Sequence, residues 1–373
     1  MRPIYLLLCL LLAGNCFAQE FYLFTGTYTN GDSKGIYVYR FNAATGDATP
    51  VSIAAGVDHP SYLALSPNGK YLYAVNQWRG EKPATVSAFR FDTATGQLQF
   101  LNKQPSGGDG PCYVSVNATN TWVMVANYTA GTLAAFHVKD DGSLEAFTQM
   151  IAHNGSSIDT ARQSKPHVHS VVFSPDEHFL FVPDLGMDKV MTYAFDNTAD
   201  VPLTQATPPY TAIKPGSGPR HITFHPSLPY AYLIEELSGT VSVYQYKNGR
   251  LSFLQRVRSH AHNYTGQKSS ADIHVSPDGK FLYTSNRGDA NNIAIYSINA
   301  VTGQVAIKGF QSTMGKIPRN FMIDPTGNYL LAANQETNNV TIFKRNLKTG
   351  LLTYTGKQIT VPNPVCLKML KIN

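Results

Sequence analysis

The stretch IHVSPDGKFLYTSN at residues 273–286 contains two short runs of alternating apolar residues on either side of a Ser-Pro-Asp-Gly turn. Two such runs joined by a turn sequence predict a β-hairpin. Similar segments recur along the chain: SYLALSPNGKYLYAVN (61–76), CYVSVNATNTWVMVAN (112–127), SVVFSPDEHFLFVPD (170–184), ITFHPSLPYAYLIEE (222–236) and FMIDPTGNYLLAAN (321–334). The chain is therefore built from repeated hairpins.

These repeats are evenly spaced. Pro175, Pro226 and Pro277, which occupy the same place in their turns, lie 51 residues apart, and Pro325 follows after 48. Each hairpin is followed by a third apolar run, such as IAIYSIN at 293–299, and then by a turn and a weaker fourth run. Four antiparallel strands repeating about every 50 residues are typical of a β-propeller blade. No strong amphipathic-helix period appears, so the predicted fold class is all-β.

The two ends of the chain complete one further blade. FYLFTGTY at 21–28 resembles the second strand of a repeat, and VCLKML at 365–370 resembles a first strand. Pairing between them would close the ring and remove a free sheet edge. The sequence therefore predicts a single domain over residues 19–373, a seven-bladed β-propeller with four antiparallel strands per blade.

Residues 1–18 predict a secretory signal peptide. Arg2 precedes an apolar run, and Cys16-Phe17-Ala18 offers small residues for cleavage after Ala18. No other stretch is long enough to span a membrane. We therefore expect an exported protein, periplasmic or secreted, without a membrane partner after cleavage. The remaining cysteines, Cys112 and Cys366, fall in non-neighbouring repeats and are expected as buried thiols.

Composition narrows the class of partner. The formal net charge is +6, and charged residues make up 14% of the chain. No Lys/Arg cluster of the kind that nucleic-acid-binding proteins carry is present, so we expect no nucleic-acid partner. A mildly basic protein fits a site for a small anionic molecule. We expect a monomer or a weak homo-oligomer.

A spacing of sixteen residues joins the start of each first strand to the end of the following second strand. The first strand of a blade lines the central channel, and its hairpin returns the chain to the face where it started. The two ends of this spacing, named position one and position two, therefore surround one mouth of the channel. Position one holds Ser61, Cys112, His169, Arg220, Ala271, Arg319 and Val365, and position two holds Tyr28, Gln77, Tyr128, Leu185, Glu236, Arg287 and Gln335.

Five of these residues, His169, Arg220, Glu236, Arg287 and Arg319, place charge or a titratable ring in one funnel. Charged groups in a narrow channel cost desolvation energy unless they are paired or used. They indicate a functional site or, alternatively, a structural ion-pair network that includes Arg220 and Glu236. The polar residues just before position two favour local backbone bonding instead. They are Asn76, Asn127, Asp184, Glu235, Asn286 and Asn334.

Several motifs give the chain a family resemblance. They are PHVHS (166–170), GPRH (218–221), EEL (235–237), SNRG (285–288) and PRNF (318–321). In this combination the chain resembles the propeller lactonases, a family that includes bacterial 6-phosphogluconolactonases of the propeller type and fungal 3-carboxy-cis,cis-muconate lactonizing enzymes. The resemblance covers essentially the whole chain after the signal peptide and implies a seven-bladed propeller.

The resemblance also implies which residues act. The implied catalytic residues are His169, Arg220, Glu236 and Arg287. His167 is a rival for the histidine role and, with Glu235, Arg319 and Gln335, a candidate for substrate binding.

A lactone hydrolase similar to 6-phosphogluconolactonase is the predicted function. Guanidinium groups bind phosphate or carboxylate in a bidentate manner, which suits a small anionic lactone or sugar acid. One arginine can stabilise the oxyanion, while Glu236 and His169 share the base and acid roles in either order. The funnel holds more cations than acids, which opposes a metal site, so neither a metal nor another cofactor is expected.

Two other functions remain consistent with the sequence. A muconate-type lactonizing cycloisomerase would use the same residues in reverse, and a non-catalytic binding propeller would use the fold alone. Export complicates the choice of substrate, because phosphorylated gluconolactone belongs to cytosolic metabolism. The long loops at 154–165 and 259–270, the second with His260 and His262, enter the same face and could shape specificity.

Overall fold

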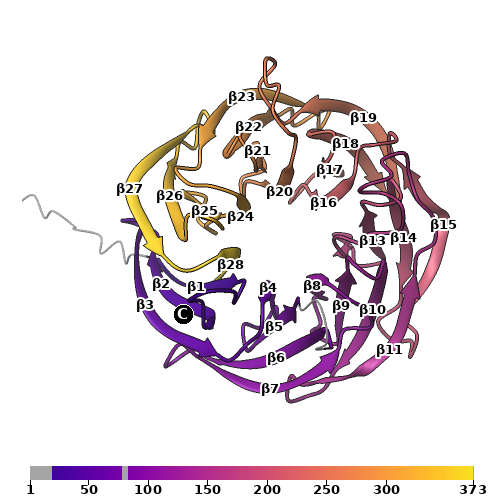
Figure 1. The fold of residues 1–373 in the computed structure, drawn as a ribbon, viewed down its shortest axis with the longest axis horizontal. Coiled ribbons are helices and arrows are strands. Elements are labelled where there is room, and N and C mark those ends of the chain that lie inside the picture. The colour runs from indigo at the N-terminus through magenta and orange to yellow at the C-terminus, as the bar shows by residue number, and fades with distance from the viewer. Residues whose placement is uncertain (1–18, 78–82, 373) are drawn as a thin grey trace, which may run out of the picture.

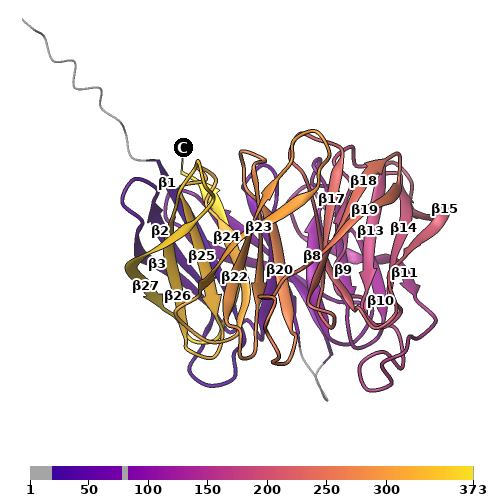
Figure 2. The same ribbon diagram turned by 90° about the horizontal axis from the view of Figure 1, so that it is seen from above.

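The computed structural model describes residues 19–77 and 83–372, so the predicted signal peptide lies outside the described residues. Seven four-stranded antiparallel sheets stand around a central channel like the blades of a propeller (Figure 1). From the side the ring is a short cylinder, with the strands running between its two faces (Figure 2). The prediction of an all-β, seven-bladed propeller is confirmed. Within the described ranges, no helix has the length and apolarity needed to cross a bilayer.

In each blade the first strand lies nearest the channel and the fourth lies outermost (Figure 1). Blade by blade, the strands are β28 (Pro364–Lys371), β1 (Glu20–Thr27), β2 (Gly35–Asn42) and β3 (Asp47–Ala55); β4 (Pro60–Leu65), β5 (Tyr71–Asn76), β6 (Thr85–Asp92) and β7 (Gln97–Pro105); β8 (Pro111–Val116), β9 (Trp122–Asn127), β10 (Thr132–Val138) and β11 (Leu144–Ala152); β12 (Val172–Phe173), β13 (Phe179–Asp184), β14 (Lys189–Phe195) and β15 (Leu203–Ala212); β16 (Pro219–Phe224), β17 (Tyr230–Glu235), β18 (Thr240–Lys247) and β19 (Arg250–Arg258); β20 (Ser270–Val275), β21 (Phe281–Asn286), β22 (Asn292–Ile298) and β23 (Val305–Ser312); β24 (Pro318–Ile323), β25 (Tyr329–Asn334), β26 (Asn339–Arg345) and β27 (Leu352–Thr360).

The ring closes through one blade made from both ends of the chain. Strand β28 pairs antiparallel with β1, from Phe21 opposite Lys371 to Thr27 opposite Pro364, and the sheet order is β28-β1-β2-β3. The predicted pairing of the terminal strands is therefore confirmed. Because β28 and β1 form hydrogen bonds to each other, neither strand presents an unpaired edge where the two ends of the chain meet.

One backbone hydrogen bond recurs in all seven blades and fixes the geometry of the mouth. The amide N–H at position two donates to the carbonyl of the residue two places before position one, at 2.7–3.1 Å. Glu236 donates in this way to Gly218, and Arg287 donates to Ser269. The two positions of every blade therefore lie side by side at the same end of the channel.

A break in strand register turns additional side chains towards the channel. Pro219 pairs with Glu235 and His221 pairs with Ile234, so Arg220 between them is left out of the ladder. Such β-bulges re-aim side chains. Similar shifts occur in β4, β8, β20, β24 and β28. As a result, consecutive residues line one channel cavity, bordered by Ser61, Tyr62, Cys112, Arg220, His221, Arg319, Asn320 and Val365.

Apolar side chains fill the space between neighbouring blades and hold the channel wall in place. Aromatic rings meet edge to face across these interfaces, as Tyr22 and Phe91 do with centroids 4.9 Å apart. Phe41 and Tyr329 make the same contact at 5.7 Å where the last blade meets the first. The six buried clusters together run around the ring.

Replacing Leu367 with Ala should loosen the closing blade. Leu367 lies in β28, is 2% exposed and packs in the cluster that contains Phe21 and Tyr329. Removing a buried leucine of this kind costs about 2 to 5 kcal/mol in the free energy of unfolding. Urea denaturation measures the change, with the exposed Lys371→Ala variant of the same strand as its control. Equal stabilities of the two variants would show that β28 does not hold the ring closed.

Candidate active site

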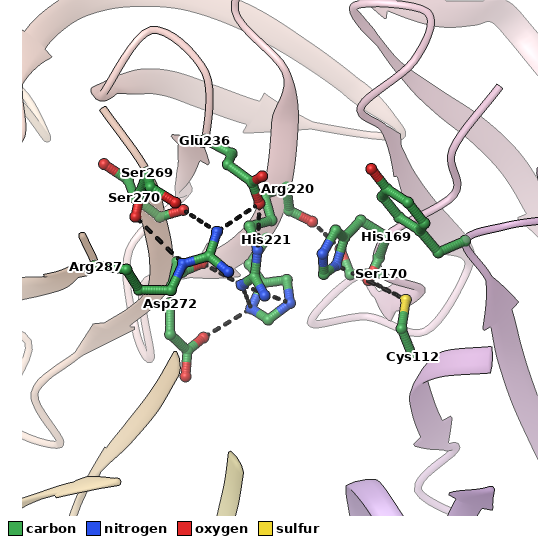
Figure 3. A network of polar contacts seen from close by, with 12 residues as sticks. Cys112, His169, Ser170, Arg220, His221, Glu236, Ser269, Ser270, Asp272 and Arg287 are labelled. Carbon is green, nitrogen blue, oxygen red and sulfur yellow. Dashed lines mark hydrogen bonds and ion pairs between the residues drawn. The ribbon is translucent and has the colours of Figure 1, made fainter. Parts of the chain in front are cut away.

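Residues from neighbouring blades meet around the carboxylate of Glu236 (Figure 3). Arg220 in β16 donates from Nε to Glu236 Oε2 at 3.0 Å, across a single blade. Arg287, directly after β21 in the next blade, places Nη2 2.9 Å from the same oxygen. The structure thus brings together three residues whose equivalence was inferred from spacing. It also contains the Arg220–Glu236 ion pair that we expected if these residues formed a structural ion-pair network.

A third arginine reaches this carboxylate from the long loop at 154–165. Arg162 Nη2 donates to Glu236 Oε1 at 2.7 Å and to the Tyr128 hydroxyl at 3.3 Å. Burial alone would raise the pKa of Glu236, but Arg287, Arg220 and Arg162 together lower this pKa to about 2. Glu236 is therefore ionised at neutral pH, and both of its oxygens accept bonds from guanidinium groups.

Arg220 is a buried cation at the centre of this cluster. It is 1% exposed, its Nη1 donates to the Ala271 carbonyl, and the same atom lies 3.3 Å from the ring of His221. Burial, followed by the charges of Arg287 and Arg319, lowers the pKa of Arg220 to about 10. The guanidinium still carries its charge at neutral pH.

Arg319 in β24 stands apart from the other arginines of the mouth. Within residues 19–77 and 83–372, no acidic side chain forms an ion pair with its guanidinium, and no group accepts a hydrogen bond from it. Its guanidinium carbon lies 5.6 Å from the centroid of the Tyr28 ring. The hydroxyl of Tyr28 in turn donates to Gln77 at 2.8 Å. The guanidinium of Arg319 therefore has N–H groups that can donate hydrogen bonds to a ligand.

His169 lies just before β12 and is buried at the wall of the channel. Its Nδ1 is 3.8 Å from the sulfur of Cys112, and its ring meets the rings of Tyr128 and His221 edge to face. Burial and then Arg220, His221 and Arg319 hold the pKa of His169 well below its usual range. The imidazole is therefore neutral at neutral pH. Cys112 and Cys366 are both free and buried.

A second polar layer lies deeper in the channel, beneath Arg220 (Figure 3). Asp272 accepts from His221 Nδ1 at 2.8 Å and from His274 Nε2 at 2.9 Å, and it also bonds Asn320. Burial alone would raise the pKa of Asp272, but these histidines hold it well below its usual range. In the part of the chain that the structure describes, no three His, Cys, Asp or Glu side chains are arranged to hold a metal ion.

The structure places His167 and Gln335 at the rim. His167 stacks on Tyr128 with ring centroids 4.4 Å apart, and its Nδ1 lies 2.9 Å from the Tyr128 carbonyl. Gln335 is half-buried at position two of the blade that carries Arg319. The other long loop, 259–270, lines a separate pocket together with Arg258 of β19.

Glu235, in contrast, is not brought to the mouth. It is fully buried, and its carboxylate lies inside its own blade, where it accepts from Ser242 and bonds Arg256. Its equivalents bond loop backbone; Asn76, for example, donates to the Asp58 carbonyl at 2.9 Å. This geometry favours a structural role for Glu235, as for the other polar residues before position two, over the predicted contact with substrate.

The family model described as "Lactonase, 7-bladed beta-propeller" matches residues 22–369. The chain belongs to this lactonase family. A 6-phosphogluconolactonase of Formosa agariphila is 38% identical over 93% of this lactonase and 99% of the relative.

Solved structures are similar to this chain in fold as well as in sequence. A Bacteroides fragilis protein, solved as a candidate 6-phosphogluconolactonase, is 42% identical with a TM-score of 0.90, covering 94% of this lactonase and 98% of that chain. The periplasmic gluconolactonase PpgL of Pseudomonas aeruginosa is 35% identical with a TM-score of 0.91, covering 95% of this lactonase and 100% of that chain.

Sequence reasoning missed three residues of this lactonase site: Arg162, His221 and Asp272. The loop of Arg162 stood out by its length, but nothing in its sequence indicated where the side chain would point. His221 and Asp272 directly follow position one, so strict alternation along a strand would have turned them away from the channel. The register shifts in β16 and β20 explain the difference.

Proposed function

We propose that this lactonase hydrolyses a sugar-derived lactone carrying an anionic group, with His169 as the proton acceptor. The observation that carries the proposal is a neutral imidazole beside a cluster in which three guanidinium groups bond one carboxylate and a fourth, that of Arg319, lies in the same channel mouth. The imidazole can take a proton from water, and the excess positive charge can stabilise an oxyanion and attract an anionic substrate.

His169 suits the role of base better than Glu236 does. The neutral imidazole has a lone pair that can accept a proton, whereas both oxygens of Glu236 already accept hydrogen bonds from arginines. We assign to Glu236 the task of holding Arg220 and Arg287 in place. Once His169 has accepted a proton, it becomes the acid that the second half of the reaction needs.

The proposed reaction has two steps. Water adds to the lactone carbonyl carbon as its proton passes to His169, and the carbonyl oxygen becomes an oxyanion. The bond between that carbon and the ring oxygen then breaks, and His169 returns the proton to the ring oxygen. The product is a hydroxy acid, and His169 is neutral again.

Arg220 and Arg319 are the groups assigned to the oxyanion. Both line the same channel cavity as Cys112, whose sulfur contacts His169. Guanidinium charge fixed in a buried site stabilises a developing oxyanion without reorganisation. These arginines supply the positive charge that a Lewis-acidic metal would supply, so we propose a metal-independent reaction. His167 and Gln335, at the rim, would contact the rest of the substrate.

The names of two relatives indicate which lactones to consider as substrates. One is called a 6-phosphogluconolactonase and the other a periplasmic gluconolactonase. We propose that this protein is exported, in keeping with its predicted signal peptide. A carboxylated sugar lactone or an aldonolactone then suits its compartment better than a phosphorylated one, while the charge of the mouth favours the anionic substrates.

A lactonizing cycloisomerase is the alternative that the same residues allow. NMR separates the two reactions, because incubation with a sugar lactone yields the open hydroxy acid, whereas incubation with a carboxymuconate yields a lactone. Turnover of the muconate alone would favour the cycloisomerase. If the protein turned over neither compound and no other lactone, a non-catalytic binding propeller would be favoured.

Replacing Arg319 with Gln should lower the kcat on charged and neutral lactones alike, by about 10²-fold, because the oxyanion loses one fixed cation. The KM should change much less. Steady-state kinetics measure both quantities, and the exposed Arg250→Gln variant is the control for loss of one positive charge. A kcat equal to that of the control would remove Arg319 from the oxyanion site.

A further inference from the structure

Arg162 differs from the two other arginines that bond Glu236. The side chain of Arg162 is 41% exposed, whereas those of Arg220 and Arg287 are 2% and 12% exposed. Arg220 lies in β16 and Arg287 directly follows β21, whereas Arg162 lies in a loop. An exposed guanidinium can leave its partner and be solvated, whereas a buried one would become an uncompensated charge. Only Arg162 is therefore free to exchange partners at low cost.

The loop itself is held firmly, so the exchange needs only a side-chain rotation. Asp159 accepts from the backbone N–H groups of Ala161 and Arg162 at 3.1 Å. Gln163, which is fully buried, donates to the Leu185 carbonyl at 2.8 Å. With the backbone fixed on both sides of Arg162, its long side chain alone can move.

The position of Arg162 suits an incoming ligand. Its two partners, Tyr128 and Glu236, occupy position two in the blades on either side of the one that carries His169. The side chain therefore spans the mouth at the blade of the proposed base. A lactone seated against His169 would bring its substituents towards this guanidinium.

We propose that Arg162 recognises the anionic group of the substrate by exchanging Glu236 Oε1 for a phosphate or carboxylate oxygen. This inference rests on the proposed lactone hydrolysis. It makes Arg162 a specificity residue, because a neutral lactone offers nothing to replace the Glu236 bond. Glu236 stays compensated after the exchange, since Arg220 and Arg287 both bond its other oxygen, Oε2.

The test compares lactones that differ only in charge. The phosphate pair is 6-phosphoglucono-δ-lactone and glucono-δ-lactone, and the carboxylate pair is glucaro-γ-lactone and glucono-γ-lactone. In Arg162→Gln we expect kcat/KM to fall by about 10- to 100-fold for the charged member of the recognised pair, mainly through KM. The neutral member should be unchanged or faster. The pair with the larger loss identifies the anion as phosphate or carboxylate.

Lys165→Gln is the matched control. Lys165 is an exposed cation of the same loop that donates to the Thr129 carbonyl and does not touch Glu236. This variant should keep the wild-type preference between charged and neutral lactones, and Arg162→Lys should recover part of it. Equal losses of Arg162→Gln on charged and neutral members would overturn the inference and leave Arg162 a structural residue. If the wild-type protein opened no lactone at all, the proposed function itself would fail.

The pH profile gives a second readout. The charged and titratable groups around Glu236 are Arg162, Arg220, Arg287, Arg319, Tyr128 and Cys112. Removing one of three bonded cations disfavours the carboxylate, so the pKa of Glu236 in the free enzyme should rise. The stability lost on acidification below about pH 4.3 should therefore be smaller in Arg162→Gln than in Lys165→Gln. An equal acid dependence of stability in the two variants would mean that Arg162 does not act on Glu236.

If Arg162→Gln folded poorly, binding would still decide the question. Isothermal titration of wild-type protein with 6-phosphogluconate, glucarate and gluconate should show tighter binding of 6-phosphogluconate or glucarate, which carry a second anionic group, than of gluconate. That preference should weaken when the same titration is repeated with Arg162→Lys, which keeps the charge but loses bidentate geometry. Equal affinities for all three acids in the wild-type protein would contradict the inference.

Discussion

Replacing His169 with Asn should lower the kcat for lactone opening by roughly 10²- to 10⁴-fold, the range that a positioned proton acceptor contributes. The imidazole is neutral because burial and the charges of Arg220 and Arg319 hold down its pKa. Asparagine keeps a polar group of similar reach but cannot accept the proton. The fold should be little affected, because among the residues that the structure describes Cys112 alone bonds the His169 ring with its side chain, through a weak sulfur contact at 3.8 Å.

Two further histidine variants make this prediction specific. His178→Asn removes an exposed imidazole from the hairpin turn of the same blade and should leave the kcat unchanged. His167→Asn tests the rival histidine, whose ring stacks on Tyr128 at the rim, and should act mainly on KM. A large loss of kcat in His167→Asn together with a small one in His169→Asn would reverse the assignment.

Replacing Glu236 with Gln should both inactivate and destabilise the protein. The change leaves Arg162, Arg220 and Arg287 without their shared counter-charge. Breaking a buried ion pair from one side costs about 3 to 5 kcal/mol. The kcat should fall by roughly 10³-fold, since Arg220 and Arg287 lose the group that fixes their positions. Urea denaturation and steady-state kinetics measure the two effects.

The stability effect should depend on pH in a defined direction. The folded-state pKa of Glu236 is about 2, below the value of about 4.3 expected in an unfolded chain. Ionised Glu236 therefore stabilises the fold fully above about pH 4.3, and this contribution, about 3 kcal/mol, is lost as the pH falls towards about 2. Glu236→Gln should lack this part of the acid dependence.

Glu336→Gln, which removes an exposed acid one residue beyond position two in another blade, serves as the control and should retain the wild-type acid dependence. An acid dependence of Glu236→Gln equal to that of this control would show that Glu236 is not held ionised by the arginines.

The fold could be predicted because each blade repeats one local signal. The Ser-Pro-Asp-Gly turn at 276–279, flanked by alternating apolar residues, specifies a hairpin without reference to the rest of the chain. Because successive blades have similar sequences and pack against one another in the same way, the repeats also predict a closed ring. Even the unusual pairing of β28 with β1 followed from the incomplete repeats at the two ends.

The site was predictable only where it follows the repeat. Arg220, Glu236 and Arg287 occupy equivalent places, and the recurring amide-to-carbonyl bond fixes them at one mouth. Arg162 lies in a loop that is longer than the corresponding connection in most other blades, so the repeat could not place its side chain. The charge state of His169 was also out of reach, because it depends on burial and on arginines distant in sequence.

Proton release in a pH-stat shows whether this channel mouth opens an anionic lactone with His169 as base. Purified mature protein is added to glucaro-γ-lactone, 6-phosphoglucono-δ-lactone and their neutral counterparts, with His169→Asn in parallel. We expect hydrolysis well above the spontaneous rate, a higher kcat/KM for a charged lactone than for its neutral counterpart, and near-background rates for His169→Asn. Release at the spontaneous rate with every lactone, or equal rates for wild type and His169→Asn, would contradict this expectation.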